Sequence, residues 1–429
     1  TRLPDRIPIG TKEVRERFSA ESVRAFYEHW YRPDNMTLVL VGDLQGLNPE
    51  ALIAEHFQRM VVPNTPLPQA PDRGRVRQLG QVFSIFEHEI PTVIISIARL
   101  KHWEPRPSTR AQWIENLPLS YANSMLNLRY RELAKLEGAP YLSASVSNNR
   151  SMKIIDGVNL GIACQPERWQ EAMAFCEREL RRALEHGFQS VELDELRANS
   201  LRAFDEAVDR EPTAHSGALF GPILSAAESP SIPTSAKSYR EIMRPAVEAL
   251  SVEQCLAALR EAWSEGELSI QATGNLDLGS EDSALLLAAY EASRAQPVDA
   301  SEEIVVAEFA YGSDPDQRGK IAERRHVEDL DFVQVRFANG VSVNVKRTEF
   351  KEKQILIGGE LGEGRLTPEP EQSLREWIGK RVVSAGGLEA HSADDVRCLL
   401  AGELVGVSFG LGREHLPRTG GTTDEGLLC

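Results

Sequence analysis

The sequence has few cysteines and no arrangement of them that would stabilise a small fold. Its 429 residues include five cysteines, which are spread from Cys164 to Cys429 with no Cys-x-x-Cys pair. An odd number of widely separated cysteines predicts neither a disulfide framework nor a structural zinc site. We interpret most of them as core or incidental residues, a pattern that suits the cytosol and the periplasm equally.

Long apolar runs and an excess of positive charge are also missing. No run approaches the roughly 18 to 20 apolar residues that a membrane helix requires, and the first residues lack the order of a signal peptide. The 64 acidic and 48 basic side chains give a formal net charge of −16, which opposes binding to phosphate backbones. We therefore expect no membrane span and no nucleic-acid partner. A chain this long exceeds the roughly 250 residues at which single domains stop growing, so at least two domains are expected.

The nine histidines never occur at the spacing of a zinc peptidase motif. Such a motif needs two histidines one helical turn apart, because side chains at i and i+4 converge on one ion. The closest two, His88 and His102, are fourteen residues apart. His88 is followed by a glutamate, but Thr92 stands where the second histidine belongs and Pro91 would break the helix. The residues predict no metal site.

One segment has the form of a serine nucleophile motif. Residues 406–410 read Gly-Val-Ser-Phe-Gly, the pattern that holds a serine on the strand-to-helix turn of α/β-hydrolases. His415 follows Ser408 by only seven residues, and no helical pattern succeeds the serine. The alternating apolar residues are typical of an ordinary strand. We predict a strand here and keep a serine hydrolase only as an alternative.

The first sixty residues predict a helix, a strand and a second helix. Ser19 is placed to cap a helix over 20–31, an aliphatic run at 37–41 predicts a buried strand, and Asn48 is placed to cap the next helix. The apolar faces of these elements must pack on something. The polar residues that flank the strand are assigned to turns: Asp34, Asn35, Gly42 and Asp43.

The middle of the chain has a mixed pattern of strands and helices. A proline-rich linker is predicted at 61–79. Strands are expected at 82–86, 92–98, 142–146, 158–163 and 268–273. Helices are expected at 120–136, 166–185, 191–209, 252–264 and 281–293. This combination predicts an α+β domain.

The last third begins after a segment without periodicity. Residues 295–320 are rich in Gly, Pro, Asp and Glu and predict a second linker. From Phe332 apolar residues alternate on both sides of Asn339-Gly340, the strongest hairpin signal that a sequence gives. A strand at 354–358 and helices near 370–384 and 394–401 follow.

Several segments together resemble the pitrilysin/insulinase family of zinc metallopeptidases. Residues 26–43, F-Y-E-H-W-Y-R-P-D-N-M-T-L-V-L-V-G-D, resemble the pattern that leads into the last strand of that family's first domain. Residues 124–133 are similar to its second-domain helix, and residues 329–350 to the opening of its third domain. Residues 385–392 and 420–425 are similar to later parts of that third domain.

The resemblance implies a clamshell of tandem α+β domains, each with a mixed, mainly antiparallel sheet and helices packed on it. In that family a peptide is enclosed and cut by zinc, which an inverted His-x-x-Glu-His helix and a distant Glu hold in the first domain. Those ligands would lie upstream of Thr1, and the Arg and Tyr that complete the site would lie beyond Cys429. We therefore assign no catalytic, substrate-binding or metal residue here. His391, near the third-domain counterpart of the zinc helix, has no second histidine.

The expected organisation follows from this resemblance. Residues 1–74 would end the first domain, 75–295 would form the second, 296–325 would link the halves, and 326–429 would begin an inactive third domain. The parent would be a zinc metalloendopeptidase, while this fragment would bind no zinc. The alternative is a non-catalytic homologue that binds a peptide or a partner subunit. Peptides and the missing parts of the same polypeptide are the expected partners, and bacterial members favour the periplasm.

Overall fold

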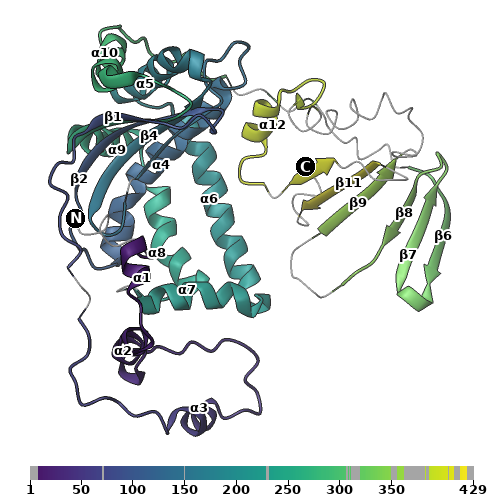
Figure 1. Cartoon of the computed structure of the whole chain (residues 1–429). Helices are drawn as coiled ribbons and strands as arrows, with labels where there is room; N and C mark the ends of the chain where they lie inside the picture. Colours follow the sequence, from purple (N-terminus) through teal and green to yellow (C-terminus); the bar gives the residue numbers. More distant parts are fainter. Residues whose placement is uncertain are drawn as a thin grey trace. The chain divides into compact units, whose positions relative to one another are not determined.

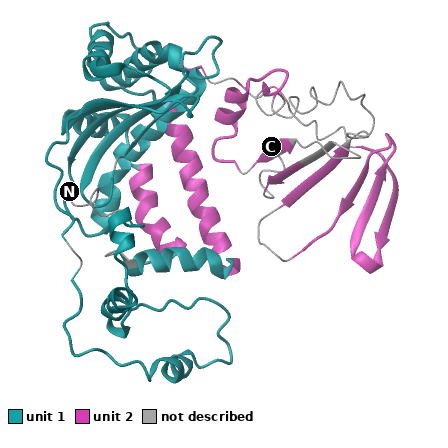
Figure 2. Cartoon of the chain, in the orientation of Figure 1, with its two compact units in different colours: residues 1–190, 214–235, 249–301 teal, residues 191–213, 236–248, 302–429 magenta. Residues whose placement is uncertain are grey.

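The structure is a computed structural model. It describes residues 8–69, 72–148, 150–228, 231–305, 319–348, 355–361, 386–403, 405–409 and 416–422, together with the single residues 308, 310 and 382. The chain divides into two compact units (Figure 2). The first contains residues 1–190, 214–235 and 249–301, and the second contains residues 191–213, 236–248 and 302–429. These units are defined by contacts within the structure, and the domain boundaries expected from the sequence stay predictions.

The first unit is built on a five-stranded sheet (Figure 1). Its strand order is β1-β5-β2-β4-β3, in which β1 and β5 run parallel and all other neighbours run antiparallel. The strands are β1 Val82–Phe86, β2 Val93–His102, β3 Ser143–Asn148, β4 Ile155–Cys164 and β5 Glu267–Gly274. The predicted α+β class, with a mixed and mainly antiparallel sheet, is confirmed.

Helices cover one face of this sheet and form the core with it. Every second side chain is buried over residues 93–97 of β2, 158–164 of β4 and 270–274 of β5, as the alternation of a strand requires. The covering helices are α4 Arg110–Leu133, α5 Trp169–His186, α9 Val252–Ser264 and α10 Asp282–Arg294. Figure 1 shows α5 and α10 side by side, and the two helices contact each other. The fully buried side chains of the core include Ile95, Ile97, Met125, Leu126, Leu160, Ile162, Met173, Leu259, Ile270 and Leu286.

Local signals explain where these helices begin and end. Thr109 accepts a hydrogen bond from the Gln112 N–H at the start of α4, and Ser251 forms a capping box at the start of α9. Gly187, with a φ of 80°, follows the last residue of α5. The prediction for α4 began only at residue 120, because Pro118 normally breaks a helix. The structure extends α4 through that proline to Arg110.

The N-terminal segment contains three short helices without a buried residue. They are α1 Lys12–Glu16, α2 Ala20–Trp30 and α3 Pro49–Phe57. The predicted caps are confirmed, since Ser19 forms a capping box and Asn48 accepts a hydrogen bond from the Ala51 N–H. Their apolar side chains remain exposed, among them Phe26 at 60% and Tyr27 at 58%.

The buried strand predicted at residues 37–41 is wrong. That segment forms no strand, and Leu38 and Leu40 are 52% and 50% exposed. A strand needs a neighbour to pair with, and no strand that the structure describes pairs with these residues. The turn assignments nearby are confirmed: the Asn35 side chain donates to the Trp30 carbonyl, and Asp43 accepts from the Gln45 N–H.

Two proline-containing helices were missed by the sequence analysis. They are α7 Ser216–Glu228 in the first unit and α8 Ala236–Glu248 in the second, and each has a proline inside it. In the second unit α8 pairs with α6 Ser190–Arg210. Asp205 of α6 accepts hydrogen bonds from Arg240 and Arg244 of α8, at 3.0 and 2.6 Å.

In its described residues, the rest of the second unit contains two small sheets and the helix α12 Ala393–Leu399. The first sheet has the order β6-β7-β8, with β6 Ile321–Val327, β7 Phe332–Phe337 and β8 Ser342–Val345. The predicted hairpin at Asn339-Gly340 is confirmed, and Gly340 has a φ of 91°. Strand β6 was not predicted. The second sheet has the order β10-β11-β9, with β9 Ile355–Leu361, β10 Gly406–Phe409 and β11 Leu416–Thr422.

The helix α12 of the second unit lies against α6. Arg397 and Cys398 of α12 both bond to the Glu195 carboxylate, and the Gly402 N–H donates to Asn199. The helix predicted near 394–401 is therefore confirmed. The helix predicted near 370–384 lies outside the described residues, apart from residue 382.

A glycine at the end of β5 provides a test of this sheet. Gly274 has a φ of 129°, and a Cβ built there would lie 2.1 Å from the Thr92 carbonyl oxygen. We expect Gly274→Ala to lower the free energy of unfolding by about 1–3 kcal/mol, because the backbone must move or remain strained. Urea denaturation would measure this change.

The matched control is Gly161→Ala in β4 of the same sheet. A Cβ at Gly161 would have its nearest neighbour, the Asn159 side-chain nitrogen, at 3.5 Å, which is an ordinary contact. We expect this variant to lose less than about 1 kcal/mol. Equal losses in the two variants would contradict the close approach of β5 to β2 at Gly274.

Candidate functional site

The histidines do not form a metal site in the described part of the chain. Within the ranges that the structure describes, no three His, Cys, Asp or Glu side chains are placed to hold a metal ion. His88 lies in an exposed turn after β1, with its ring 3.6 Å from the Glu87 carboxylate. His391 is buried, and its Nε2 accepts a hydrogen bond from the Ala310 N–H at 2.8 Å. We assign no zinc ligand among the described residues.

Ser408 lies in a strand, as the alternation predicted. It belongs to β10, where its hydroxyl is 2.6 Å from the Thr419 hydroxyl and 3.2 Å from the Thr419 carbonyl oxygen of β11. These are cross-strand contacts, and no strand-to-helix turn follows directly in the described residues. His415 lies outside them. The geometry therefore lends no support to a nucleophilic serine.

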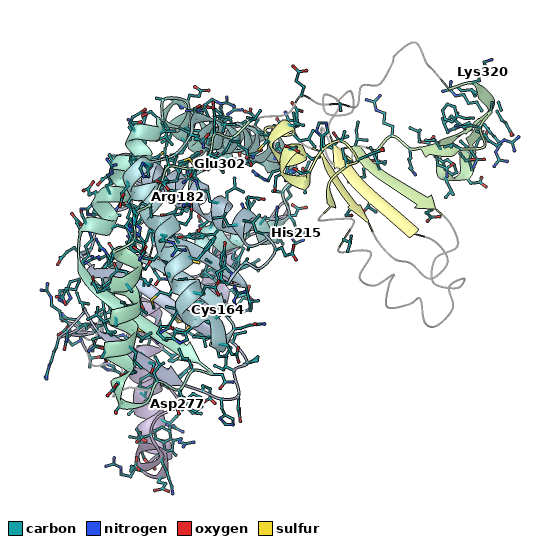
Figure 3. All side chains as sticks on the ribbon, turned by 90° about the horizontal axis from the view of Figure 1, so that it is seen from above. Cys164, Arg182, His215, Asp277, Glu302 and Lys320 are labelled. Atoms are coloured by element: carbon teal, nitrogen blue, oxygen red, sulfur yellow. The ribbon has the colours of Figure 1, made fainter. Side chains whose placement is uncertain are left out.

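Three of the described thiols, Cys164, Cys176 and Cys255, are buried, and Cys398 is partly buried. Cys164 at the end of β4 (labelled in Figure 3) and Cys176 in α5 are both buried. Burial raises the pKa of Cys164 to about 11 and raises the pKa of Cys176 further. Burial also raises the pKa of Cys398 to about 11. Because the thiolate is the nucleophilic form, these thiols are unreactive near neutral pH.

Two buried carboxylates on α5 are the main polar feature that the sequence analysis missed. Glu177 and Glu179 are 4% and 3% exposed. Glu177 pairs with Arg181 at 3.3 Å and accepts a hydrogen bond from the Ser293 hydroxyl. Glu179 pairs with Arg182 and lies 3.5 Å from Arg129 of α4. Each buried charge thus has a cationic partner, which offsets the cost of removing it from water.

The arginines of this cluster also hold the chain that leaves α10. Arg181 donates to the carbonyls of Ser293, at 3.0 Å, and of Gln296. Arg182, labelled in Figure 3, donates to the Asp299 carbonyl at 2.8 Å. The His186 ring nitrogen lies 2.8 Å from the Val298 carbonyl oxygen. Residues 296–299, at the beginning of the predicted linker, are therefore fixed to α5. We call these three side chains and their carbonyl partners the α5 anchor.

The face of the sheet opposite the core carries neutral hydrogen-bonding groups. Most side chains that alternate with core residues on β2, β4 and β5 are partly buried, whereas Ile94 is exposed and Ala98 is buried. Some bond to each other, as Ser96 does to Asn159 and Gln271 to Thr273. Such groups can meet the N–H and C=O groups of a peptide. We call this surface, which carries Ser96, Ser145, Asn159, Gln271 and Thr273, the open face.

Comparison with known proteins agrees with this architecture. Residues 17–200 match the family described as the peptidase M16 inactive domain. A curated relative, the probable zinc protease PqqL of Escherichia coli, is 24% identical over 215 residues, which are 49% of this chain and 23% of that protein. The chain thus aligns with a minor part of this relative's length.

Solved structures show the same fold. The periplasmic protease PqqL from Escherichia coli has a TM-score of 0.58 and 18% identity, and the match covers 99% of this chain and 47% of that one. A predicted insulinase family protease from Yersinia pestis has a TM-score of 0.56 and 17% identity, covering 67% and 60% of the two chains. The α+β fold is therefore one that peptidases share. Residues 17–200 thus match the inactive domain of a peptidase family, and the chain as a whole has a fold similar to that of insulinase-type proteases.

The α5 anchor can be tested by removing its central cation. Arg181→Met leaves the buried Glu177 without its guanidinium partner and releases two carbonyls of the chain after α10. We expect the free energy of unfolding to fall by about 3–5 kcal/mol, as when one partner of a buried pair is removed. Hydrogen exchange at residues 296–299 should also become faster.

Arg178→Met is the matched control on the same helix. Arg178 makes no ion pair with any residue that the structure describes, so the change should cost less than about 0.5 kcal/mol. The role of the anchor would be refuted if exchange at residues 296–299 were the same in both variants. Urea denaturation and mass-spectrometric hydrogen exchange give the two readouts.

Proposed function

We propose that this chain is a non-catalytic part of a zinc-dependent metalloendopeptidase that encloses peptides and hydrolyses them. Two observations together support the proposal. Residues 17–200 match the inactive domain of a peptidase family, while the nine histidines of the chain never occur at the spacing of a zinc peptidase motif. The zinc ligands would then belong to a part of the parent protein that precedes Thr1. We assign no step of hydrolysis to the described residues.

In this proposal the first unit supplies a wall of the enclosure. Its open face presents uncharged hydroxyl and amide groups, which can hydrogen-bond an extended peptide without selecting one sign of charge. The α5 anchor fixes the point at which the chain leaves the sheet domain. A sheet surface without charge selectivity, with the following chain held in one position, suits a protein that must close around peptides of differing sequence.

The apolar N-terminal segment supports the presence of a further part. Phe26, Tyr27 and Leu52 are 60%, 58% and 42% exposed on helices α2 and α3. At about 25 cal/mol for each Å² of apolar area, covering several such side chains is worth several kcal/mol. Exposed apolar side chains that gather on a surface often mark an interaction site. We propose that the same parent polypeptide covers it.

The second candidate is a non-catalytic homologue that holds a peptide or a partner subunit. The match to the inactive domain favours it as much as it favours the first proposal, because neither requires a zinc ligand in this chain. The two differ only in what the rest of the parent protein contains. The sequence that precedes Thr1 therefore decides between them.

We also propose that the protein works in the periplasm. The support is a similar structure described as the periplasmic protease PqqL from Escherichia coli. Among the described residues, no helix is long and apolar enough to cross a bilayer.

The experiment is to express the chain with the roughly 150 codons, about one domain, that precede Thr1. If the parent is an enzyme, that region encodes an inverted His-x-x-Glu-His motif, and the full-length parent cleaves a quenched fluorescent peptide. Changing the motif Glu to Gln should abolish cleavage while one zinc per chain is retained, because the Glu acts on the water and does not bind the metal.

Hydrogen exchange of residues 20–57 gives a readout that does not depend on activity. These residues should become at least about tenfold slower to exchange in the extended protein, because their apolar faces are then covered. Slower exchange without the motif would support the non-catalytic homologue. Unchanged exchange would show that the upstream region does not cover this segment, and would contradict the proposed organisation.

A further inference from the structure

The two edge strands of the five-stranded sheet are β1 and β3. An edge strand presents outward N–H and C=O groups, which readily pair with any other extended chain. Strand addition of this kind is a common way to bind peptides and a common route to aggregation. A protein that works among unfolded peptides is especially exposed to this hazard. We therefore identified which side chains hydrogen-bond to the outward backbone groups of β3 and β1.

On the β3 edge, a side chain of α4 hydrogen-bonds to the outward backbone groups of one residue. The Asn127 amide nitrogen donates to the Val146 carbonyl at 2.9 Å, and the Val146 N–H donates to the Asn127 amide oxygen at 2.7 Å. Strand β4 pairs with β3 on the other side, with Val146 opposite Leu160. Asn127 thus makes the two hydrogen bonds that a residue of an added strand would make. It does so at an inner residue of β3.

On the β1 edge, the first two residues of α10 hydrogen-bond to outward backbone groups. The Ser84 N–H donates to the Asp282 carboxylate at 2.6 Å, and the Ser283 hydroxyl donates to the Val82 carbonyl. Strand β5 occupies the inner side, where the Ile270 N–H donates to the Gln81 carbonyl. The alternate residues Val82 and Ser84 therefore direct their backbone groups outward, towards α10. The backbone N–H of Ser84 holds the pKa of Asp282 below its usual value, so this acceptor is charged at neutral pH.

We infer that Asn127 on one edge, and Asp282 with Ser283 on the other, close this sheet against the addition of an extended strand. Both caps come from helices of the core, so they are present whenever the domain is folded. The excluded ligand is an extended backbone, whether it belongs to a peptide or to a second copy of this chain. The open face remains for contact through side chains. The inference concerns the sheet itself and holds whatever the parent protein hydrolyses.

The first test uses the unchanged protein. The amide hydrogens of Val146 and Ser84 should exchange at least about a hundredfold more slowly than unprotected amides, because each has an internal acceptor. Exchange at the rate of an unprotected amide at both positions would overturn the inference. This measurement needs no variant and is unaffected by any failure of a variant to fold.

The second test opens each edge separately. Asn127→Ala frees both groups of Val146, and Ser283→Ala frees the Val82 carbonyl. Sedimentation velocity measures pairing between copies, and fluorescence anisotropy measures binding of a labelled acetyl-Thr-Val-Thr-Val-Thr-amide peptide. We expect association at least tenfold tighter than in the unchanged protein in one of these assays. Hydrogen exchange should locate the contact at β3 or β1 accordingly.

Matched controls remove hydrogen bonds without opening an edge. Asn123, one turn earlier on α4, donates to the Asn148 side chain at 3.1 Å, so Asn123→Ala frees no backbone group of β3. The Ser269 hydroxyl donates to the Gln81 carbonyl, which keeps its bond from the Ile270 N–H in Ser269→Ala. The inference is overturned if Asn127→Ala and Ser283→Ala associate no more than these controls in both assays. Asn127→Asp keeps an acceptor for the Val146 N–H and should behave between Asn127→Ala and the unchanged protein.

Discussion

The burial of one face of β2 is the constraint on which the first unit depends. Strand β2 lies between β4 and β5, and its side chains Ile95 and Ile97 are inaccessible to solvent or nearly so. Covering that face requires the apolar sides of α5 and α9, which both contact β2 and β4. In the resulting sheet β1 and β3 are the edges, and the open face lies opposite the covering helices. The positions of the edge caps and of the open face follow from this single packing arrangement.

The buried carboxylates of α5 and several outward backbone groups of the edge strands are matched with partners. The buried carboxylates of α5 are paired with arginines, and those arginines use their remaining donors on backbone carbonyls after α10. The outward backbone groups of Val146, Ser84 and Val82 are matched by Asn127, Asp282 and Ser283 respectively. An unpaired buried polar group costs about 1–3 kcal/mol, so these contacts restrict the fold to one arrangement. The same contacts keep the sheet from pairing with other chains.

Local elements of this fold could be predicted from the sequence, whereas long-range contacts could not. The caps at Ser19 and Asn48 and the hairpin at Asn339-Gly340 depend on a few neighbouring residues, and all three are confirmed. The strand expected at residues 37–41 failed because pairing depends on a neighbour that an aliphatic run does not supply. The bond between Glu177 and Ser293 joins residues 116 positions apart, and no local pattern predicts it. Helices α7 and α8 were missed because each contains a proline, which ordinarily argues against a helix.

We have proposed that this chain is a non-catalytic part of a zinc peptidase, a part that needs no metal of its own. The most direct test is the zinc content of the purified chain after dialysis against a mild chelator, measured by inductively coupled plasma mass spectrometry. Because no two histidines of the sequence lie one helical turn apart, we predict well below one zinc per chain. One tightly held zinc per chain would contradict the account, because the chain would then contain a metal site of its own.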